Sequence, residues 1–223
     1  GEGNGYVVTW AVGHILQLAE PQEYNAEWKQ WSLDTLPILP EMFKLKADPD
    51  KAKQLKIIKE LLKKSRRCFI ATDFDREGEA IARNILDSVN YKGEILRVKC
   101  SSYEPSDILK AMKNPLSESE SGGLNRFAAQ TARSRADWLY GMNCSRLFGL
   151  LNQRASKLKL GFVPSVGRVQ TAVMGIAVDR EKAIRNYKPK QYFVLQALLS
   201  AAGQNPFKGM VKLGDLANEF GGL

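Results

Sequence analysis

Hydrophobic positions recur with different periods along the first half of the chain, and each period predicts a different element. A short strand-like run at 6–10 opens the sequence. Over 50–64 apolar residues recur at helical spacing between lysines, which predicts an amphipathic helix on the surface. The stretch 22–49 carries several prolines and two tryptophans without a clear period, so few regular elements are expected there.

From residue 68 onward the pattern alternates between strand and helix. Residues 68–72 are nearly all apolar, as in a parallel strand covered on both faces. A helix is expected from Glu77, a second strand over 95–99, and a further helix that begins at Pro105. This order predicts an α/β domain with a mostly parallel, doubly wound sheet over residues 1–120.

The second half of the chain has a helical pattern. The segment 117–123 consists mainly of serine, glutamate and glycine, and we expect a flexible link that contains the domain boundary. Two long helices are predicted over 124–151 and 166–187, joined by a loop that contains glycine and proline, so 121–190 is predicted to be a mainly α-helical domain. Residues 191–223 begin with a strand-like pattern and are interpreted as the start of a further, incomplete β-containing domain.

The positive charge of the chain is concentrated in one segment. Residues 1–120 carry 18 Lys/Arg against 19 Asp/Glu, residues 121–190 carry 13 against 3, and residues 191–223 carry 2 against 2, so the net charge of +9 arises from the middle segment. That segment is rich in arginine and contains Trp138 and Phe148, a composition typical of a nucleic-acid-binding surface. A solvated basic face is the alternative.

Composition excludes several classes of protein. With 44% hydrophobic and 26% charged residues, the 223-residue chain is typical of a soluble globular protein. No apolar run approaches the roughly 18 residues of a membrane span, and the first residues lack the features of a signal peptide. Three widely spaced cysteines without a C-x-x-C pair indicate neither a disulfide framework nor a zinc site. We therefore expect a cytoplasmic protein without a membrane partner.

The densest group of chemically active side chains comes directly after the strand at 68–72. Asp73, Asp75 and Glu77 place three carboxylates within five residues, at the edge of an α/β sheet where ligands bind. Carboxylates this close repel one another unless a hard cation such as Mg²⁺ lies between them. The motif therefore predicts a magnesium site for phosphoryl-transfer chemistry on a phosphodiester.

Two alternatives apply to the acidic motif. An EF-hand loop that starts at Asp73 would have Gly78 at its sixth position, but its twelfth residue is Asn84 instead of a bidentate glutamate. A solvated acidic helix N-terminus, stabilised by the helix dipole, accounts for the glutamates. It does not account for Asp73 and Asp75 on either side of Phe74 at a strand end.

Two further clusters point to a nucleic acid. Arg135, Trp138, Met142 and Arg146 recur at helical spacing and share a face on which bases could stack while phosphates are held; a plain core position is the alternative for Trp138. Ser165, Val166, Gly167, Arg168, Val169 and Gln170 stand at a predicted helix start, where backbone N–H groups favour a phosphate. Ser165 could instead be only an N-cap.

These motifs resemble one known family. The run 72–80 is similar to the D-x-D-x-E motif of the Toprim fold, a Rossmann-like α/β fold, as it occurs in type IA DNA topoisomerases. The runs 3–14, 136–143 and 165–171 resemble the bacterial topoisomerase III branch of that family. The resemblance covers about 1–190, and its separate motifs occur in the family's order.

The resemblance implies a function and a set of site residues. It implies cleavage and rejoining of one DNA strand through a 5′-phosphotyrosine, dependent on Mg²⁺ and independent of ATP, with single-stranded DNA as the partner. Asp73, Asp75 and Glu77 would hold the metal, and Glu77 belongs to the catalytic acidic triad. The residues that would contact DNA are Trp31, Trp138, Arg146, Arg154 and the run 165–170. His14, in a Gly-His turn like that of the family, could be structural or functional.

The resemblance also implies parts that the sequence does not contain. The family's nucleophile is a tyrosine in a Tyr-x-Arg context, and none of the seven tyrosines has an arginine two positions further on. The family's first Toprim strand, with a catalytic Glu and Lys, would precede Gly1. We therefore expect a fragment that is inactive alone. The alternatives are another Toprim enzyme, a primase or nuclease, and a metal-independent module that binds single-stranded DNA.

Overall fold

A computed structural model describes residues 2–3, 5–100, 102–155, 165–191, 194–203 and 205–210. Contacts divide the chain into two compact units, residues 1–172 and 173–223. Helix α6 (Gln170–Arg185) begins at the end of the first unit and continues into the second. Strands β7 (Gln196–Leu199) and β8 (Phe207–Met210) of the second unit pair antiparallel.

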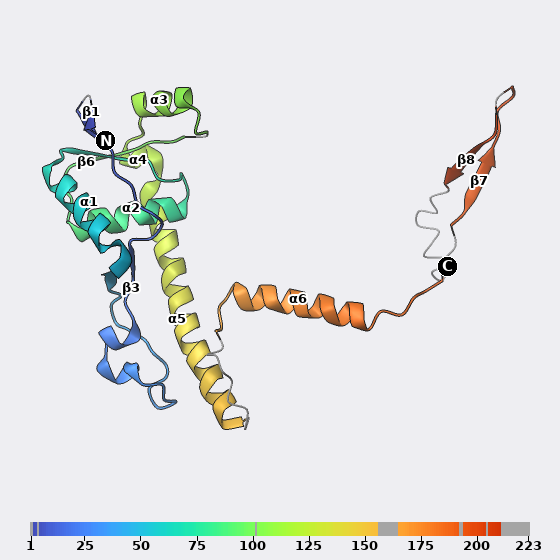
Figure 1. Ribbon diagram of the computed structural model, residues 1–223, viewed down its shortest axis with the longest axis horizontal. Helices are drawn as coiled ribbons and strands as arrows, with labels where there is room; N and C mark the ends of the chain where they lie inside the picture. The colour runs from blue at the N-terminus through green and yellow to red at the C-terminus, as the bar shows by residue number, and fades with distance from the viewer. Residues whose placement is uncertain are drawn as a thin grey trace. The chain divides into compact units, whose positions relative to one another are not determined.

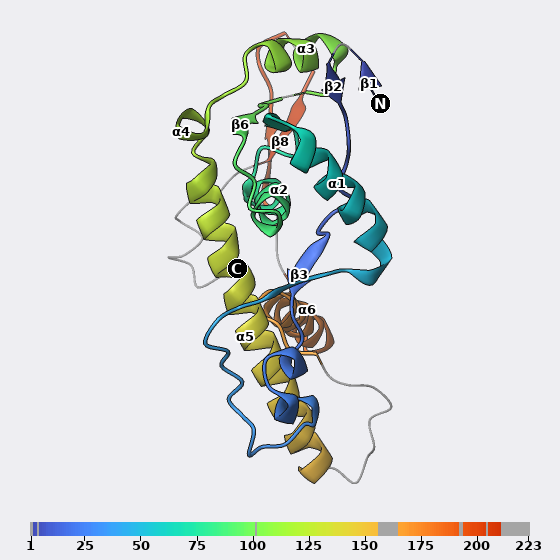
Figure 2. The ribbon, with the colours of Figure 1, turned by 90° about the vertical axis from the view of Figure 1, so that its left-hand side faces the viewer.

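The first unit contains short strands, three 3₁₀ turns and five helices among its described residues (Figures 1 and 2). In chain order these elements are β1 (Glu2–Gly3), β2 (Tyr6–Val7), β3 (Leu16–Leu18), η1 (Pro21–Glu23), η2 (Ala26–Lys29), β4 (Leu45–Ala47), η3 (Pro49–Lys51), α1 (Ala52–Lys64), β5 (Arg67–Ile70), α2 (Arg76–Ser88), β6 (Glu94–Arg97), α3 (Pro105–Lys113), α4 (Glu118–Ser121) and α5 (Gly123–Ala155). As the composition predicts, the stretch 22–49 contains only short elements.

The predicted α/β motif is confirmed in the arrangement of β5, α2 and β6. Strands β5 and β6 pair in parallel from Arg67 with Glu94 to Ile70 with Arg97, and α2 forms the connection between them. Side chains from β3, α1, β5 and α2 form the hydrophobic core of this part, which includes Ile15, Ile58, Ile70 and Ile85. The acidic motif therefore lies at the carboxyl end of a strand of the parallel sheet.

The strand β5 is shorter and less covered than its apolar sequence predicts. It ends at Ile70 instead of Thr72, and of its four residues only Ile70 is fully buried. Phe69 is half-buried and meets the ring of Tyr6 edge to face, with ring centroids 5.7 Å apart. The chain leaves the sheet after Ile70 because the ladder with β6 ends there, and residues 71–75 form a loop that leads into α2.

The segment 117–123 is folded, which corrects the expectation of a flexible link. Ser117 caps the short helix α4 through a capping box with Glu120, and Gly122 adopts a left-handed conformation with φ 62° that turns the chain into α5. The side chain of Ser121 is buried. Local capping therefore orders a stretch whose composition alone indicates a linker.

The predicted helical region after residue 123 is confirmed. Helix α5 has 33 residues and packs its first turns against α2, and its later turns run beside the chain between β3 and β4 (Figures 1 and 2). The second predicted helix starts at Gln170 instead of residue 166, and the loop residues 156–164 lie outside the described residues. No helix among the described residues is long and apolar enough to span a membrane.

Candidate functional site

The acidic motif lies where β5 ends and α2 begins. Asp75 is the N-cap of α2, and its Oδ1 accepts a hydrogen bond from the Gly78 backbone N–H at 2.7 Å. The hydroxyl of Thr72 donates to the carbonyl of Gly78 at 2.7 Å. A Cβ at Gly78 would overlap the carbonyl oxygen of Asp73. The absence of a side chain at Gly78 therefore lets the first turn of α2 lie on the backbone of the loop.

The three carboxylates of the motif each contact a different group of the protein. Asp73 Oδ1 accepts from the Tyr103 hydroxyl at 2.8 Å, Asp75 caps α2, and Glu77 Oε1 lies 3.4 Å from His14 Nε2. The hydrogen bond and charge of Asp73 raise the pKa of Tyr103. His14 thus belongs to this site.

These contacts change the predicted picture of a preassembled metal cluster. Within the described ranges, no group of three His, Cys, Asp or Glu side chains lies close enough to hold a metal ion. The three carboxylates contact three different groups, Tyr103, the Gly78 backbone N–H and His14. Each contact uses one carboxylate oxygen, so three exposed carboxylates still offer oxygen ligands of the kind that a hard divalent cation prefers.

Phe74, between the two aspartates, lies among cationic side chains. The guanidinium carbons of Arg97 and Arg126 lie 5.1 and 4.2 Å from its ring centroid, and Lys99 Nζ lies 5.2 Å away. These distances are those of cation–π contacts. The loop is therefore negatively charged at its two aspartates and surrounded by positive charge at the phenylalanine between them.

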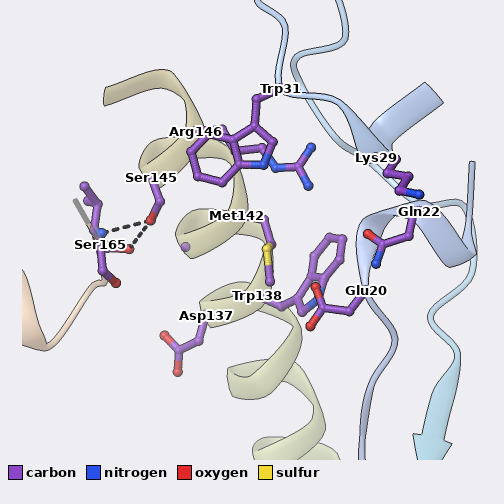
Figure 3. A pocket seen from close by; sticks show the side chains of 12 residues that line it. Glu20, Gln22, Lys29, Trp31, Asp137, Trp138, Met142, Ser145, Arg146 and Ser165 are labelled. Carbon is purple, nitrogen blue, oxygen red and sulfur yellow. Dashed lines mark hydrogen bonds between the residues drawn. The ribbon is translucent and has the colours of Figure 1, made fainter. Parts of the chain in front are cut away.

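A pocket of about 500 Å³ opens between α5 and the chain that follows β3 (Figure 3). Its walls come from three parts of the first unit: the segment 20–31, one face of α5, and the start of the run 165–170. The lining residues are Glu20, Gln22, Lys29, Trp31, Asp137, Trp138, Gly141, Met142, Ser145, Arg146, Ser165 and Val166. Five of the residues predicted to contact DNA thus meet at one cavity.

Trp138 forms part of the wall and is buried. It is 9% exposed, and its indole N–H donates to the carbonyl of Ala19 at 3.1 Å. Its ring packs edge to face against Tyr24 and Phe43, with ring centroids 5.6 Å apart in both pairs. These contacts correspond to the packing alternative for Trp138, since a ring enclosed by two others has little free face on which a base could stack.

Arg146 is buried as well, but not fully satisfied. The residue is 5% exposed, its Nη1 donates to the carbonyl of Trp28 at 2.7 Å, and its Nε is buried without a hydrogen-bond partner in the described part of the chain. Its guanidinium lies 5.3 Å from the ring centroid of Trp31. Desolvation by burial lowers the pKa of Arg146. Arg146 thus places a positive charge in the wall of the pocket and keeps one buried N–H without a hydrogen bond.

Trp31 offers the exposed aromatic surface of the pocket. It is 39% exposed and packs over Gly149 of α5, where a Cβ would lie 3.2 Å from the indole ring. Figure 3 shows Trp31 beside Arg146, with Trp138 and Met142 further along the same wall. Of the two tryptophans predicted to contact DNA, Trp31 is therefore the more exposed one.

The other predicted arginines lie elsewhere on the surface. Arg135 is exposed, and its guanidinium lies 5.3 Å from the ring centroid of Phe43. Arg154 is exposed in the last turn of α5. Neither lines the pocket. Arg135, Trp138, Met142 and Arg146 thus share a helix, as predicted, but differ in burial.

The run 165–170 is hydrogen-bonded to Ser145 and Asp137 of α5. The backbone N–H of Val166 donates to Ser145 Oγ at 2.8 Å, and Arg168 Nε donates to Asp137 Oδ1 at 2.6 Å. Arg168 lowers the pKa of Asp137. Because α6 starts at Gln170, Ser165 is not its N-cap; Ser165 Oγ accepts from the Gln170 side chain at 2.8 Å. Val169 and Gln170 are exposed.

Sequence reasoning included Asn143 in the family-like run 136–143 but gave no role to this residue, which joins α5 to the chain between β3 and β4. Asn143 Oδ1 accepts from the Ile38 backbone N–H at 2.6 Å, and its Nδ2 donates to the Ile38 carbonyl at 3.0 Å. Ile38 is completely buried. The sequence does contain one signal for this contact. Asparagine is a poor helix former, so an asparagine in the middle of a helix indicates that its side chain has a specific partner.

Two family models match the chain. A Toprim domain model matches residues 2–102, and a DNA topoisomerase model matches residues 124–219. Among curated relatives, DNA topoisomerase 3 of Vibrio cholerae is 38% identical over 200 residues, which are 88% of this chain and 30% of that protein. DNA topoisomerase 3 of Salmonella typhimurium is 36% identical over 199 residues, 87% of this chain and 30% of that protein. The chain thus spans about 30% of the length of these relatives.

A solved structure shows the same similarity. Full-length topoisomerase I from Thermotoga maritima matches with a TM-score of 0.59 and 31% sequence identity, over 87% of this chain and 29% of that one. The match extends over both the Toprim region and the helical region, as do the matches to the curated relatives.

Proposed function

Since the chain belongs to the type IA DNA topoisomerase family, we propose that it binds one strand of DNA at the pocket beside α5 and a divalent cation at the acidic loop. Together these sites would serve cleavage and rejoining of a DNA strand by a topoisomerase III-like enzyme. The observation that carries the proposal is the pairing of accessible Trp31 with buried, incompletely satisfied Arg146 in one pocket.

The pocket suits a base and its phosphate from a single strand. A base can stack on the exposed part of Trp31, and the positive charge of Arg146, which lines the same pocket, can attract a phosphate. Ser145 and Asp137 hold the run 165–170 close by, Ser145 through the Val166 backbone N–H and Asp137 through Arg168. A duplex keeps its bases stacked inside, so the pocket favours unpaired DNA.

The acidic loop suits a divalent cation, with Mg²⁺ as the proposed ion. Asp73, Asp75 and Glu77 would hold it through their carboxylate oxygens. A divalent cation supplies positive charge that stabilises the charge on phosphate oxygens during transesterification. The residues of this chain orient the ligands: Asp75 through the N-cap, Glu77 through His14, and Asp73 through Tyr103 and the loop backbone.

The nucleophile of the reaction is not provided by a Tyr-x-Arg motif in this sequence. Strand transfer through a phosphotyrosine conserves the energy of the phosphodiester bond, so no nucleotide cofactor is part of the proposal. The chain's proposed share of the reaction is to hold the single strand and the metal.

A second candidate is a module that binds single-stranded DNA without metal chemistry. The observation in its favour is that each carboxylate of the acidic loop already has a protein contact. Calorimetric titration with Mg²⁺ separates the two candidates. The double variant Asp73→Asn with Asp75→Asn should lose magnesium binding and keep its fold, because asparagine also caps helices. Unchanged binding in that variant would place the metal elsewhere.

The DNA part is tested by fluorescence anisotropy of a labelled single-stranded oligonucleotide. Trp31→Ala should weaken binding by about 1–3 kcal/mol if a base stacks on the indole. Trp10→Ala is the matched control, because Trp10 is 64% exposed and lies outside the pocket. Affinity should fall with salt, by roughly 0.7 in log–log slope for each phosphate contact on a single strand. Equal affinity of wild type and Trp31→Ala would refute the pocket as the binding site.

A further inference from the structure

A buried cluster of charged side chains lies directly behind the acidic loop. Glu79 of α2 is completely buried, and Arg83 and Arg97 are 6% and 2% exposed. Glu79 accepts hydrogen bonds from Arg83 Nε at 2.7 Å, Arg97 Nε at 3.0 Å and Arg126 Nη2 at 3.4 Å. Neither the metal site nor the pocket uses Glu79. Burial of a carboxylate is unfavourable unless it is paired, so the three arginines hold Glu79 in one position.

Arg97 joins this cluster to the backbone of the acidic loop. Its Nη1 donates to the carbonyls of Ile70 and Thr72 at 2.8 and 2.7 Å, and its Nη2 donates to the carbonyl of Asp73. These carbonyls lie at and beyond the end of the β5–β6 ladder, which stops at Ile70 and Arg97. One rigid guanidinium therefore takes the place of a strand neighbour for the carbonyls of Thr72 and Asp73, and it is a second donor to the Ile70 carbonyl, which also accepts from the Val98 N–H.

The same cluster reaches the first turns of α5. Arg126 of α5 contacts both Glu79 and the ring of Phe74. At Gly123, where α5 begins, a Cβ would overlap the Glu79 carboxylate. The start of α5 can thus approach the cluster only because residue 123 has no side chain. The position of the loop and the position of α5 depend on the same buried carboxylate.

We propose that Arg97 is a positioning residue for the acidic loop and that Glu79 holds Arg97 in the orientation this role requires. The inference rests on the proposed metal function, since it assigns to Arg97 and Glu79 the task of presetting Asp73 for the cation. A lysine at position 97 keeps the charge but can no longer bind three carbonyls and Glu79 at once. A glutamine at position 79 keeps the shape but loses the charge that opposes three arginines.

The experiment compares wild type with Arg97→Lys, Glu79→Gln and Arg67→Lys in the 223-residue chain. Arg67 is the matched control, because it pairs with Glu94 at 2.6 Å on the exposed side of the same sheet. Hydrogen exchange by NMR, without metal, follows two amides at the ends of the loop: Val98, which donates to Ile70, and Gly78, which donates to Asp75. Calorimetry with Mg²⁺ gives the metal affinity of the same samples.

Arg97→Lys and Glu79→Gln should accelerate exchange at Val98 and Gly78 and lower the Mg²⁺ affinity by about 10–100-fold, as is usual when a group that orients metal ligands is changed. Exchange in α1 and the behaviour of Arg67→Lys should stay as in the wild type. Faster exchange in the two variants of a chain that binds no Mg²⁺ would refute the metal site and uphold the positioning role.

Two outcomes would overturn the inference. Wild-type exchange at both reporter amides in Arg97→Lys and Glu79→Gln would show that the loop holds its position without them. Acceleration to the same extent throughout α1 and α2 would show a general loss of stability instead of a local one.

Discussion

At Gly78 the first turn of α2 lies directly on the backbone of Asp73. The backbone of Asp73 can take this position only because residue 78 has no side chain. The atoms that a Cβ would meet belong to the backbone of Asp73 and cannot rotate away as a side chain could. The same position explains why a glycine stands near the start of α2, where a glycine is otherwise unfavourable.

Gly78→Ala should therefore lower the free energy of unfolding, by about 1–3 kcal/mol as for other overpacked sites. It should also weaken Mg²⁺ binding, because the loop that carries Asp73 has to move. Gly175→Ala in α6 is the control: a Cβ there meets no atom within 4 Å, so the substitution should raise stability by about 0.5–1 kcal/mol. Urea unfolding of both variants measures the difference. A Gly78→Ala variant as stable as wild type would contradict the close approach of α2 to the Asp73 backbone.

Trp138 and Trp31 differ in burial, and their substitutions should differ accordingly. Trp138→Ala removes a ring that packs between Tyr24 and Phe43 and should cost about 3–5 kcal/mol of unfolding free energy. Trp31→Ala should affect DNA binding far more than stability. Thermal and urea unfolding, monitored by circular dichroism, provide the comparison. A stable Trp138→Ala variant with reduced DNA affinity would return Trp138 to the DNA-contacting set.

At the scale of elements, α5 is the part to which the other parts of the site attach. Trp138 and Asn143 bind the chain between β3 and β4, Arg146 binds η2 through Trp28, and Asp137 and Ser145 bind the run 165–170. The shape of the pocket therefore depends on the contacts that hold these segments against α5.

The ion pair between Asp137 and Arg168 should make the attachment of the run 165–170 sensitive to acid. Because Arg168 lowers the folded-state pKa of Asp137, the pair contributes stability that is present above the unfolded pKa of about 3.9 and is lost as the pH falls through the lower folded value. Both side chains are partly exposed, so the contribution should be under about 1 kcal/mol.

Asp137→Asn measures this contribution. Wild type should be slightly more stable than the variant at neutral pH, and the two should become equal once the pH has fallen below the lowered folded-state pKa of Asp137, as the carboxyl takes up its proton. Urea unfolding across this pH range provides the values. A difference in stability that grows as the pH falls would contradict the pairing.

At the scale of the whole molecule, the proposed sites on the first unit would bind DNA and a divalent cation, while transesterification also requires an aligned nucleophile. Seven tyrosines are present, none with an arginine two positions further on. Tyr140 is the tyrosine that lies in α5, and it is 41% exposed.

We predict that this chain alone neither cleaves nor relaxes DNA, even with Mg²⁺. The test is incubation with end-labelled single-stranded DNA, followed by denaturing electrophoresis, with Tyr140→Phe as the comparison. A labelled band that migrates with the protein, and that disappears in Tyr140→Phe, would show that a nucleophile is present in the chain after all.

The sequence by itself determined the α/β motif around residues 67–97, the long helix after residue 123 and the position of the acidic motif between strand and helix. Each depends on a local signal: an apolar strand followed by aspartates, a helical repeat, and acidic residues at the start of a helix. The similarity to the family also followed from contiguous runs of residues, which can be recognised in a sequence without knowing which residues are in contact.

Only the tertiary structure decided which side chains are accessible and which are paired. A helical period places Arg135, Trp138 and Arg146 on one face, but the neighbours that bury two of them come from residues 19–43. Glu79 has the sequence context of a solvated first-turn glutamate, yet Arg83 one turn along α2 and the distant Arg97 and Arg126 enclose it. Burial and pairing arise between segments far apart in the chain, and for that reason no local pattern of residues contains them.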